Sequence, residues 1–193
     1  MKISNVGEMK AMDRQAIEQF GIPEEILMEN AGRAAFEILS GEWGVAGRRY
    51  VLFCGAGHNG GDGLVVARHI LAGGGTPRIF LVGDPERFRG AAKTNWGIIA
   101  RLPIAVKRVQ KIAAVRSAVL HADGIVDALF GTGLDRDVDG VCRKVIDLIN
   151  AAGRPVLSLD IPSGVSGDTG EILGTAVQAD DTVTFGLPKI GNL

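Results

Sequence analysis

The residues best suited to chemistry in this sequence gather in three polar segments, each of which follows an apolar run. The first is GAGHNGGDG, residues 55–63, and the second is GTGLDRD, residues 131–137, shortly after Asp127. The third is DIPSG, residues 160–164. Ligands of open α/β sheets bind beyond the carboxyl ends of the strands. If the apolar runs are parallel strands, the three segments meet at one edge of the sheet.

The first segment matches the pattern GxGxxG through Gly55, Gly57 and Gly60. Glycine lets the backbone approach a ligand closely, and free amides near a helix N-terminus attract anions. The same pattern also fits a tight turn without a ligand. Because this one lies between an expected strand and an expected helix starting near Leu64, we expect a loop that forms part of a nucleotide-like ligand site.

Three polar side chains distinguish this segment from a simple pyrophosphate turn, namely His58, Asn59 and Asp62. A carboxylate at Asp62 would repel a neighbouring phosphate, and it suits a sugar hydroxyl or a helix N-terminus better. The chain has three scattered histidines, which do not form a zinc-binding pattern.

Two aspartates, Asp127 and Asp160, are embedded in apolar sequence. A buried carboxylate is costly unless it is paired, hydrogen-bonded or bound to a cation. Each aspartate could instead cap a nearby turn, but two of them beside a glycine-rich segment favour a functional site. Ser163 lacks the surroundings of a GxSxG nucleophile, so a role in a turn is favoured for it.

The elements that must position these segments follow from the hydrophobic pattern. Residues 9–20 and 23–39 predict two N-terminal helices, and short apolar runs then alternate with helical segments. We expect strands at 50–54, 78–82, 104–106, 124–130, 155–160 and 181–185, and helices at 64–72, 91–101, 115–121 and 141–152. This alternation predicts the α/β class, with a mostly parallel central sheet and helices on both faces. The chain stops soon after the last strand, which suggests a trimmed chain or a tail that pairs little.

Composition narrows the function classes. Of the 193 residues 46% are apolar and 22% are charged, with a formal net charge of −1, as in ordinary globular domains. No basic cluster marks a surface for nucleic acid or an anionic membrane. Cys54 and Cys142 are too few and too far apart for a disulfide scaffold or a structural zinc site. Because no signal peptide or membrane span is apparent, we expect a cytoplasmic protein.

Five motifs occur in order through nearly the whole chain: LMENAG (27–32), GAGHNGGDGLVVAR (55–68), VDALFGTGL (126–134), LDIPSGV (159–165) and TFGLPK (184–189). Together they resemble the NAD(P)H-hydrate epimerases, the YjeF N-terminal domain family. The resemblance implies a Rossmann-like three-layer sandwich with two N-terminal helices, in a single domain of residues 1–193. It also implies repair of hydrated NADH or NADPH (NAD(P)HX) by interconversion of its R and S forms at C6, which supplies a dehydratase that takes only S.

The resemblance further implies roles for individual residues. Substrate contacts are expected from His58, Asn59, Gly60, Gly61, Asp62, Gly131, Thr132, Gly133, Leu134, Asp135, Arg136, Asp137 and Asp160. Asp160 is also the candidate for acid–base catalysis. One potassium ion per chain is expected at Asn59, Asp127 and Ser163, since oxygen donors suit hard cations. Cys142 replaces a tyrosine that contacts the substrate in the family, which bears on substrate affinity rather than on the reaction.

Two other functions stay open from the sequence. A dinucleotide-dependent oxidoreductase is favoured by GxGxxG and by Asp84, which lies where a ribose-binding acid is expected. A non-catalytic nucleotide-binding or scaffold module would have the same fold. For the chain itself we expect a small-molecule substrate, no nucleic-acid or membrane partner, and a homodimer that uses the apolar surface of the N-terminal helices.

Overall fold

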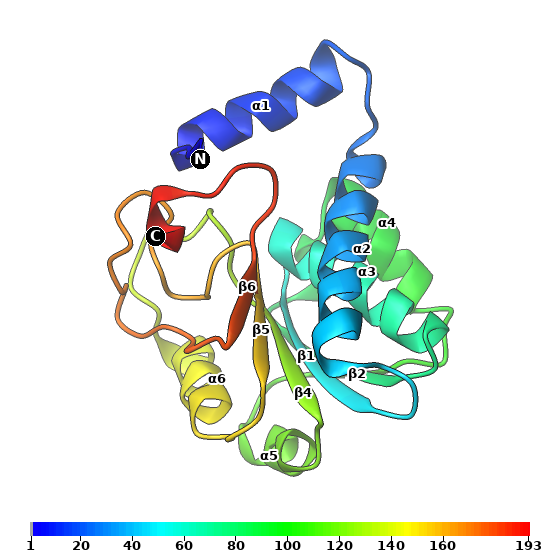
Figure 1. Ribbon diagram of the computed structural model, residues 1–193. Coiled ribbons are helices and arrows are strands. Elements are labelled where there is room, and N and C mark those ends of the chain that lie inside the picture. The colour runs from blue at the N-terminus through cyan, green and yellow to red at the C-terminus, as the bar shows by residue number, and fades with distance from the viewer. Residues whose placement is uncertain (1) are drawn as a thin grey trace.

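A six-stranded, wholly parallel sheet forms the centre of the computed structural model, which describes residues 2–193 (Figure 1). Its strands are β1 (Arg49–Gly55), β2 (Thr76–Val82), β3 (Ala105–Arg108), β4 (Gly124–Ala128), β5 (Val156–Leu159) and β6 (Asp181–Val183). Their order is β3-β2-β1-β4-β5-β6. The order reverses between β1 and β4, and this switch point is where α/β sheets bind ligands.

Helices cover both faces of this sheet (Figure 1). On one face lie α2 (Glu24–Trp43), α3 (His58–Ala72) and α4 (Gly90–Ile99), and on the other lie α5 (Ala113–Leu120) and α6 (Gly140–Asn150). The predicted three-layer, Rossmann-like sandwich is therefore confirmed. That residues 1–193 form a single domain stays a prediction. Within residues 2–193, no helix has the length and apolar character needed to span a membrane.

The core explains why β1 reads as an unbroken apolar run. Leu52 and Cys54 pack in the cluster beneath α2, α3 and α4, whereas Val51 and Phe53 pack in the cluster beneath α5 and α6. Successive side chains of a strand point to opposite faces, so a strand covered on both faces must be apolar at every position.

Helix α1 (Val6–Glu18) lies outside the three layers, at the end of the molecule where both termini are found (Figure 1). It begins three residues before the predicted start at Met9, because a capping box precedes its apolar positions. The Asn5 side chain accepts a hydrogen bond from the backbone of Glu8 at 2.8 Å, and the Glu8 carboxylate accepts one from the backbone of Asn5 at 2.9 Å.

The glycine-rich segment differs most from its prediction. Residues 58–63 are not a loop but the beginning of α3, with Gly57 as its N-cap. A Cβ atom on Gly60 would lie 1.8 Å from the carbonyl oxygen of Gly55, and one on Gly63 would lie 2.7 Å from Ala128 Cβ. These glycines therefore allow the first turns of α3 to pack directly on β1 and β4, which local sequence patterns do not reveal.

The C-terminal segment, defined here as residues 184–193, also differs from expectation. Ser4 forms a parallel bridge with Lys189, and its backbone amide donates to the Pro188 carbonyl at 2.9 Å. A short 3-10 helix, η2 (Ile190–Asn192), follows. Of the two alternatives for the chain end, the tail that pairs little is therefore wrong, because this segment is hydrogen-bonded to Ser4 and, as described below, to Asp160.

Candidate functional site

Asp160 directly follows β5 at the carboxyl edge of the sheet. Its φ angle is 67°, and it is the one residue other than glycine with a positive φ among residues 2–193. Its backbone amide donates to the Val183 carbonyl at 2.7 Å, and its carbonyl accepts from the Asn192 side chain at 3.2 Å. A left-handed conformation costs a non-glycine residue on the order of 1 kcal/mol and is often found at functional sites. Strand β6 and the C-terminal segment hold Asp160 in this conformation.

Lys189 forms an ion pair with the Asp160 carboxylate. Its ammonium group also donates to Thr184 Oγ1 at 3.0 Å and to the Phe185 carbonyl at 2.7 Å. The Lys189 residue is only 2% exposed, so this is a buried charge that is fully hydrogen-bonded. Lys189 was not among the predicted site residues. The signal for it was a single charge in an otherwise uncharged tail, TFGLPKIGNL.

Asn59 and Gly131 lie beside Asp160. A Cβ atom on Gly131 would be 3.2 Å from Asp160 Oδ2 and 3.3 Å from Asn59 Cβ. Asn59 is 8% exposed, and neither its side-chain oxygen nor its nitrogen has a hydrogen-bond partner within the described chain. An unpaired buried amide is costly, and in a native structure it calls for an external partner such as a ligand, an ion or water.

Asp62 follows Asn59 by three residues, which places the two side chains on one side of α3. Asp62 is 9% exposed. Burial raises its pKa well above the ordinary value, and the negative charges of Asp160 and Asp13 raise it further, while Lys189 acts in the opposite sense. Asp13 belongs to α1, so this helix contributes charge to the site. Burial also raises the pKa of Asp13 itself.

Asp127 lies on β4 and is completely buried. Its Oδ1 accepts from Ser163 Oγ at 2.6 Å and from the Leu129 amide at 3.2 Å, and its Oδ2 accepts from Ser158 Oγ at 2.8 Å and from the Ser163 amide at 2.9 Å. Burial raises the pKa of Asp127 and these hydrogen bonds lower it. The four bonds use all four acceptor positions of the carboxylate, so the buried charge is satisfied without a cation.

The predicted potassium ligands therefore differ in their fit. Asn59 offers a free oxygen, and Ser163 Oγ, which accepts from the Phe130 amide at 2.9 Å, keeps one lone pair. Asp127 has no free lone pair and does not fit as a direct ligand in this arrangement. Between residues 2 and 193, no group of three or more His, Cys, Asp or Glu side chains is arranged to hold a metal ion.

The remaining predicted residues of the first segment have local partners. His58 is exposed, and its Nε2 lies 3.0 Å from Glu24 Oε1. A Cβ atom on Gly61 would lie 2.8 Å from both Met28 and Ala92, so Gly61, like Gly60, serves close helix packing.

Of the predicted segment 131–137, Gly131 is the residue seen beside Asp160. Thr132 lies near Gly167, and Leu134 packs on the core beneath α5 and α6. The others, Gly133, Asp135, Arg136 and Asp137, are exposed. Cys142 is half-buried in the first turn of α6, where burial raises its pKa.

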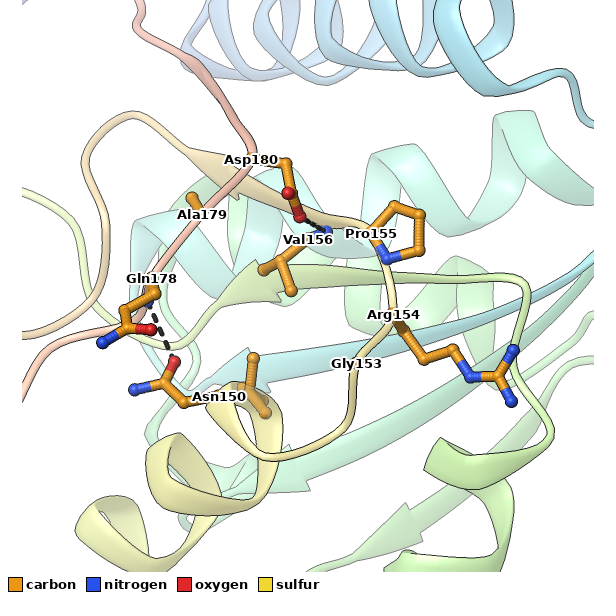
Figure 2. A pocket seen from close by; sticks show the side chains of 9 residues that line it. Asn150, Gly153, Arg154, Pro155, Val156, Gln178, Ala179 and Asp180 are labelled. Atoms are coloured by element: carbon orange, nitrogen blue, oxygen red, sulfur yellow. Dashed lines mark hydrogen bonds between the residues drawn. The ribbon is translucent and has the colours of Figure 1, made fainter.

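A hollow of about 430 Å³ at the opposite edge of the sheet is not part of this site (Figure 2). It lies where β5 and β6 begin. Two hydrogen bonds cross it: the Asn150 side chain accepts from the Gln178 amide at 2.9 Å, and Asp180 accepts from the Val156 amide at 2.8 Å. These bonds join α6 and β5 to the segment before β6, which is a structural role.

The family model described as "YjeF-related protein N-terminus" matches residues 24–191. The chain belongs to this family. The matched residues include Asn59, Asp160 and Lys189, whereas helix α1 lies outside them.

Relatives of known name agree with the membership of the chain in the YjeF-related family. The chain is 48% identical over 195 residues to the bifunctional NAD(P)H-hydrate repair enzyme Nnr of Thermofilum pendens, with 100% of this chain and 37% of the relative covered. It is 38% identical to the NAD(P)H-hydrate epimerase of Limosilactobacillus fermentum, with 95% and 85% covered. The chain thus spans little more than a third of the bifunctional relative.

Among solved structures, yeast ynu0 superposes with a TM-score of 0.89 at 23% identity, covering 100% of this chain and 83% of that chain. At this identity the likeness shows the fold alone.

Proposed function

We propose that this chain is an NAD(P)H-hydrate epimerase, an isomerase that interconverts the R and S forms of hydrated NADH and NADPH at C6. The observation that carries the proposal is Asp160, held in a left-handed conformation by Lys189 beside the unpaired amide of Asn59. The family membership and the names of relatives that match 95% or more of this chain support it.

The chemistry follows from the substrate. C6 of the hydrate carries a hydroxyl group next to the ring nitrogen, so electrons from nitrogen can expel the hydroxyl and leave a planar iminium ion. Water then adds to either face. Acid–base help to such a step contributes about a hundred- to ten-thousand-fold, and Asp160 is the proposed residue for it. We also propose that the substrate lies against Asn59, Asp62 and Gly131, with His58, Gly60 and Gly61 in the same wall and residues 132–137 as a further contact.

The oxidoreductase alternative loses its two supports in the structure. Gly60, the last glycine of GxGxxG, makes room for the Gly55 carbonyl rather than for a pyrophosphate. Asp84 caps the 3-10 helix η1 (Pro85–Arg87) by accepting from the Glu86 amide at 3.3 Å, and its carboxylate lies 3.9 Å from the Arg108 guanidinium. It is therefore engaged locally.

We propose that one potassium ion binds at Asn59 and Ser163, with Asp127 acting behind Ser163 by orienting its hydroxyl group. The free oxygen of Asn59 supports this arrangement. Bound ion would neutralise charge near the reacting ring. The test compares thermal unfolding in potassium chloride and in tetramethylammonium chloride at equal ionic strength. Potassium should raise the thermal unfolding midpoint of the native chain but not that of Asn59→Ala. Equal midpoints of the native chain in both salts would refute the potassium site.

We further propose that the chain works in the cytoplasm as a homodimer, together with an NAD(P)HX dehydratase. The exposed side chains of Met12, Ile17, Phe20 and Ile26 on α1, α2 and the turn between them support the dimer. The word "bifunctional" in the name of a relative that is much longer than this chain supports a dehydratase as the functional partner. Sedimentation equilibrium would distinguish dimer from monomer.

The decisive experiment is a coupled assay. An R/S mixture of the hydrate is given to an S-specific dehydratase, which consumes the S form quickly. The R form is then consumed in a slow phase, whose rate is set by spontaneous epimerisation of R to S. Adding this chain should abolish the slow phase, and Asp160→Asn should restore it. A slow phase unchanged by the native chain would overturn the proposed function. A change in reduced-nicotinamide absorbance with free NAD and no dehydratase would favour an oxidoreductase instead.

A further inference from the structure

Asp62 and Asp160 reach the same part of the site from two different elements. Asp62 lies in the beginning of α3, on the same side of the helix as Asn59. Asp160 ends β5, and the position of a Cβ on Gly131 is 3.2 Å from its Oδ2 and 3.3 Å from Asn59 Cβ. The charges of Asp160 and Asp13 both act on Asp62. Asn59 therefore neighbours both residues, Asp160 across Gly131 and Asp62 along α3, and the charge of Asp160 reaches Asp62.

Their surroundings are opposite in kind. Asp160 is ion-paired with Lys189. Asp62 is nine-tenths buried, and no hydrogen bond or ion pair to a residue within 2–193 stabilises its charge. The charged groups that face it are Asp13 from α1, Asp160 from the end of β5 and Lys189 from the C-terminal segment. The two aspartates raise the pKa of Asp62, and Lys189 lowers it. Helix α2 approaches this turn at Gly32, whose added Cβ would lie 3.1 Å from the Asp62 carbonyl oxygen.

We propose that Asp62 is the catalytic acid of this site and that Asp160, held by Lys189, is the matching base. This inference rests on the proposed epimerase function and deepens it. Lys189 is then a positioning residue, because it acts through Asp160. Burial and the negative charges of Asp160 and Asp13 raise the pKa of Asp62 and so favour its protonated form, as expected for the acid in a carboxyl pair with unlike environments.

The step balances without an added reactant. The ring-nitrogen lone pair forms the C6=N bond as the C6–O bond breaks, and the hydroxyl leaves as water with the proton of Asp62. A second water molecule adds to the other face of C6, the C=N electrons return to nitrogen, and Asp160 takes the proton of the incoming water. Exchange of protons with solvent restores both carboxyl groups, and the reverse direction uses them in exchanged roles.

The kinetic test uses Asp62→Asn, which keeps size and hydrogen bonding but cannot give up a proton as an acid does. We expect kcat for R-to-S conversion to fall about 100-fold or more with KM little changed. The matched control is Asp147→Asn, an exposed aspartate on α6 far along the chain from the site, which should keep the native kcat. Native kcat in Asp62→Asn would overturn the assignment.

A second variant tests the charge environment. Asp13→Asn removes one negative charge that raises the pKa of Asp62. The alkaline limb of the kcat/KM profile should therefore move to lower pH. A merely structural role of Asp62 would not move this limb, so an unshifted limb contradicts the proposal.

The protonation state can also be measured without activity. Carboxyl-carbon NMR of aspartate-labelled native protein, with the Asp62 signal identified by its loss in Asp62→Asn, should show Asp62 protonated at pH 7. A charged Asp62 at that pH would overturn the inference while leaving the epimerase function intact. Absence of R/S conversion by the native chain, in contrast, would refute the proposed function itself.

Discussion

Replacing Lys189 by methionine should destabilise the fold far more than an ordinary lysine substitution does. Methionine keeps most of the buried aliphatic stem, so the change removes mainly the ammonium group. Asp160, whose side chain is 14% exposed, then loses its ion pair, and the Phe185 carbonyl loses its donor. Thr184 keeps a hydrogen bond to Asn192 at 3.2 Å.

The magnitude follows from these losses. Removing one partner of a buried pair costs about 3–5 kcal/mol. Because water reaches part of Asp160, the low end applies, and we expect a loss of about 3 kcal/mol in the free energy of unfolding for Lys189→Met. Lys93→Met, at an exposed position on α4, is the control and should change this free energy by less than about 0.5 kcal/mol.

The assay is urea unfolding at pH 7 followed by circular dichroism, extended to a double-mutant cycle. Asparagine tolerates a left-handed φ, so Asp160→Asn removes charge without new backbone strain. The double variant should be about 2 kcal/mol more stable than the sum of the single losses predicts. Additive losses, or a loss for Lys189→Met no larger than for Lys93→Met, would refute the buried ion pair.

Three further predictions concern stability. Gly60→Ala should cost more than about 3 kcal/mol, because its Cβ would overlap the Gly55 carbonyl, whereas Gly57→Ala, with open space around its Cβ, should cost less than about 1 kcal/mol in the same unfolding assay. Because the folded state raises the pKa of Asp62, the free energy of unfolding should fall as pH rises above about 4 through the folded pKa. Asp62→Asn should flatten this fall across a pH series and exceed the native stability at pH 7. Asn192→Ala loses three hydrogen bonds, one each to Lys189, Thr184 and Asp160. The free energy of unfolding should fall by about 1–2 kcal/mol, and the thermal midpoint should drop by several degrees.

The alternation of elements was predictable because burial on both faces makes each inner strand continuously apolar. The predicted strands over 50–54 and 78–82 fall inside β1 and β2. The predicted strand over 124–130 runs past β4, which ends at Ala128, because Leu129 is buried like a strand residue while the backbone turns there. Apolarity reports burial and not backbone conformation.

The site was only partly predictable, because the sequence pattern reports burial and not which distant residues the fold brings together. Asp160 stood out because a carboxylate in an apolar run is costly, and Asn59 stood out by resemblance. Lys189 did not, because its partner lies 29 positions earlier in the chain and only the tertiary fold joins them. The helix that begins at His58 was hidden because close packing requires the same glycines that mark a loop. The predicted substrate contacts stay predictions.

The C-terminal segment gives the site a stability of its own. Strand β6 pairs with the edge of the sheet over three residues, and beyond it Lys189 and Asn192 are what fasten Asp160. Opening of a short edge element requires less free energy than unfolding of the buried strands. A small share of native molecules should therefore have this segment open while the sheet is still intact, and in these molecules Asp160 is released from its left-handed conformation. This share should grow on warming, so activity should begin to fall slightly before the main unfolding transition.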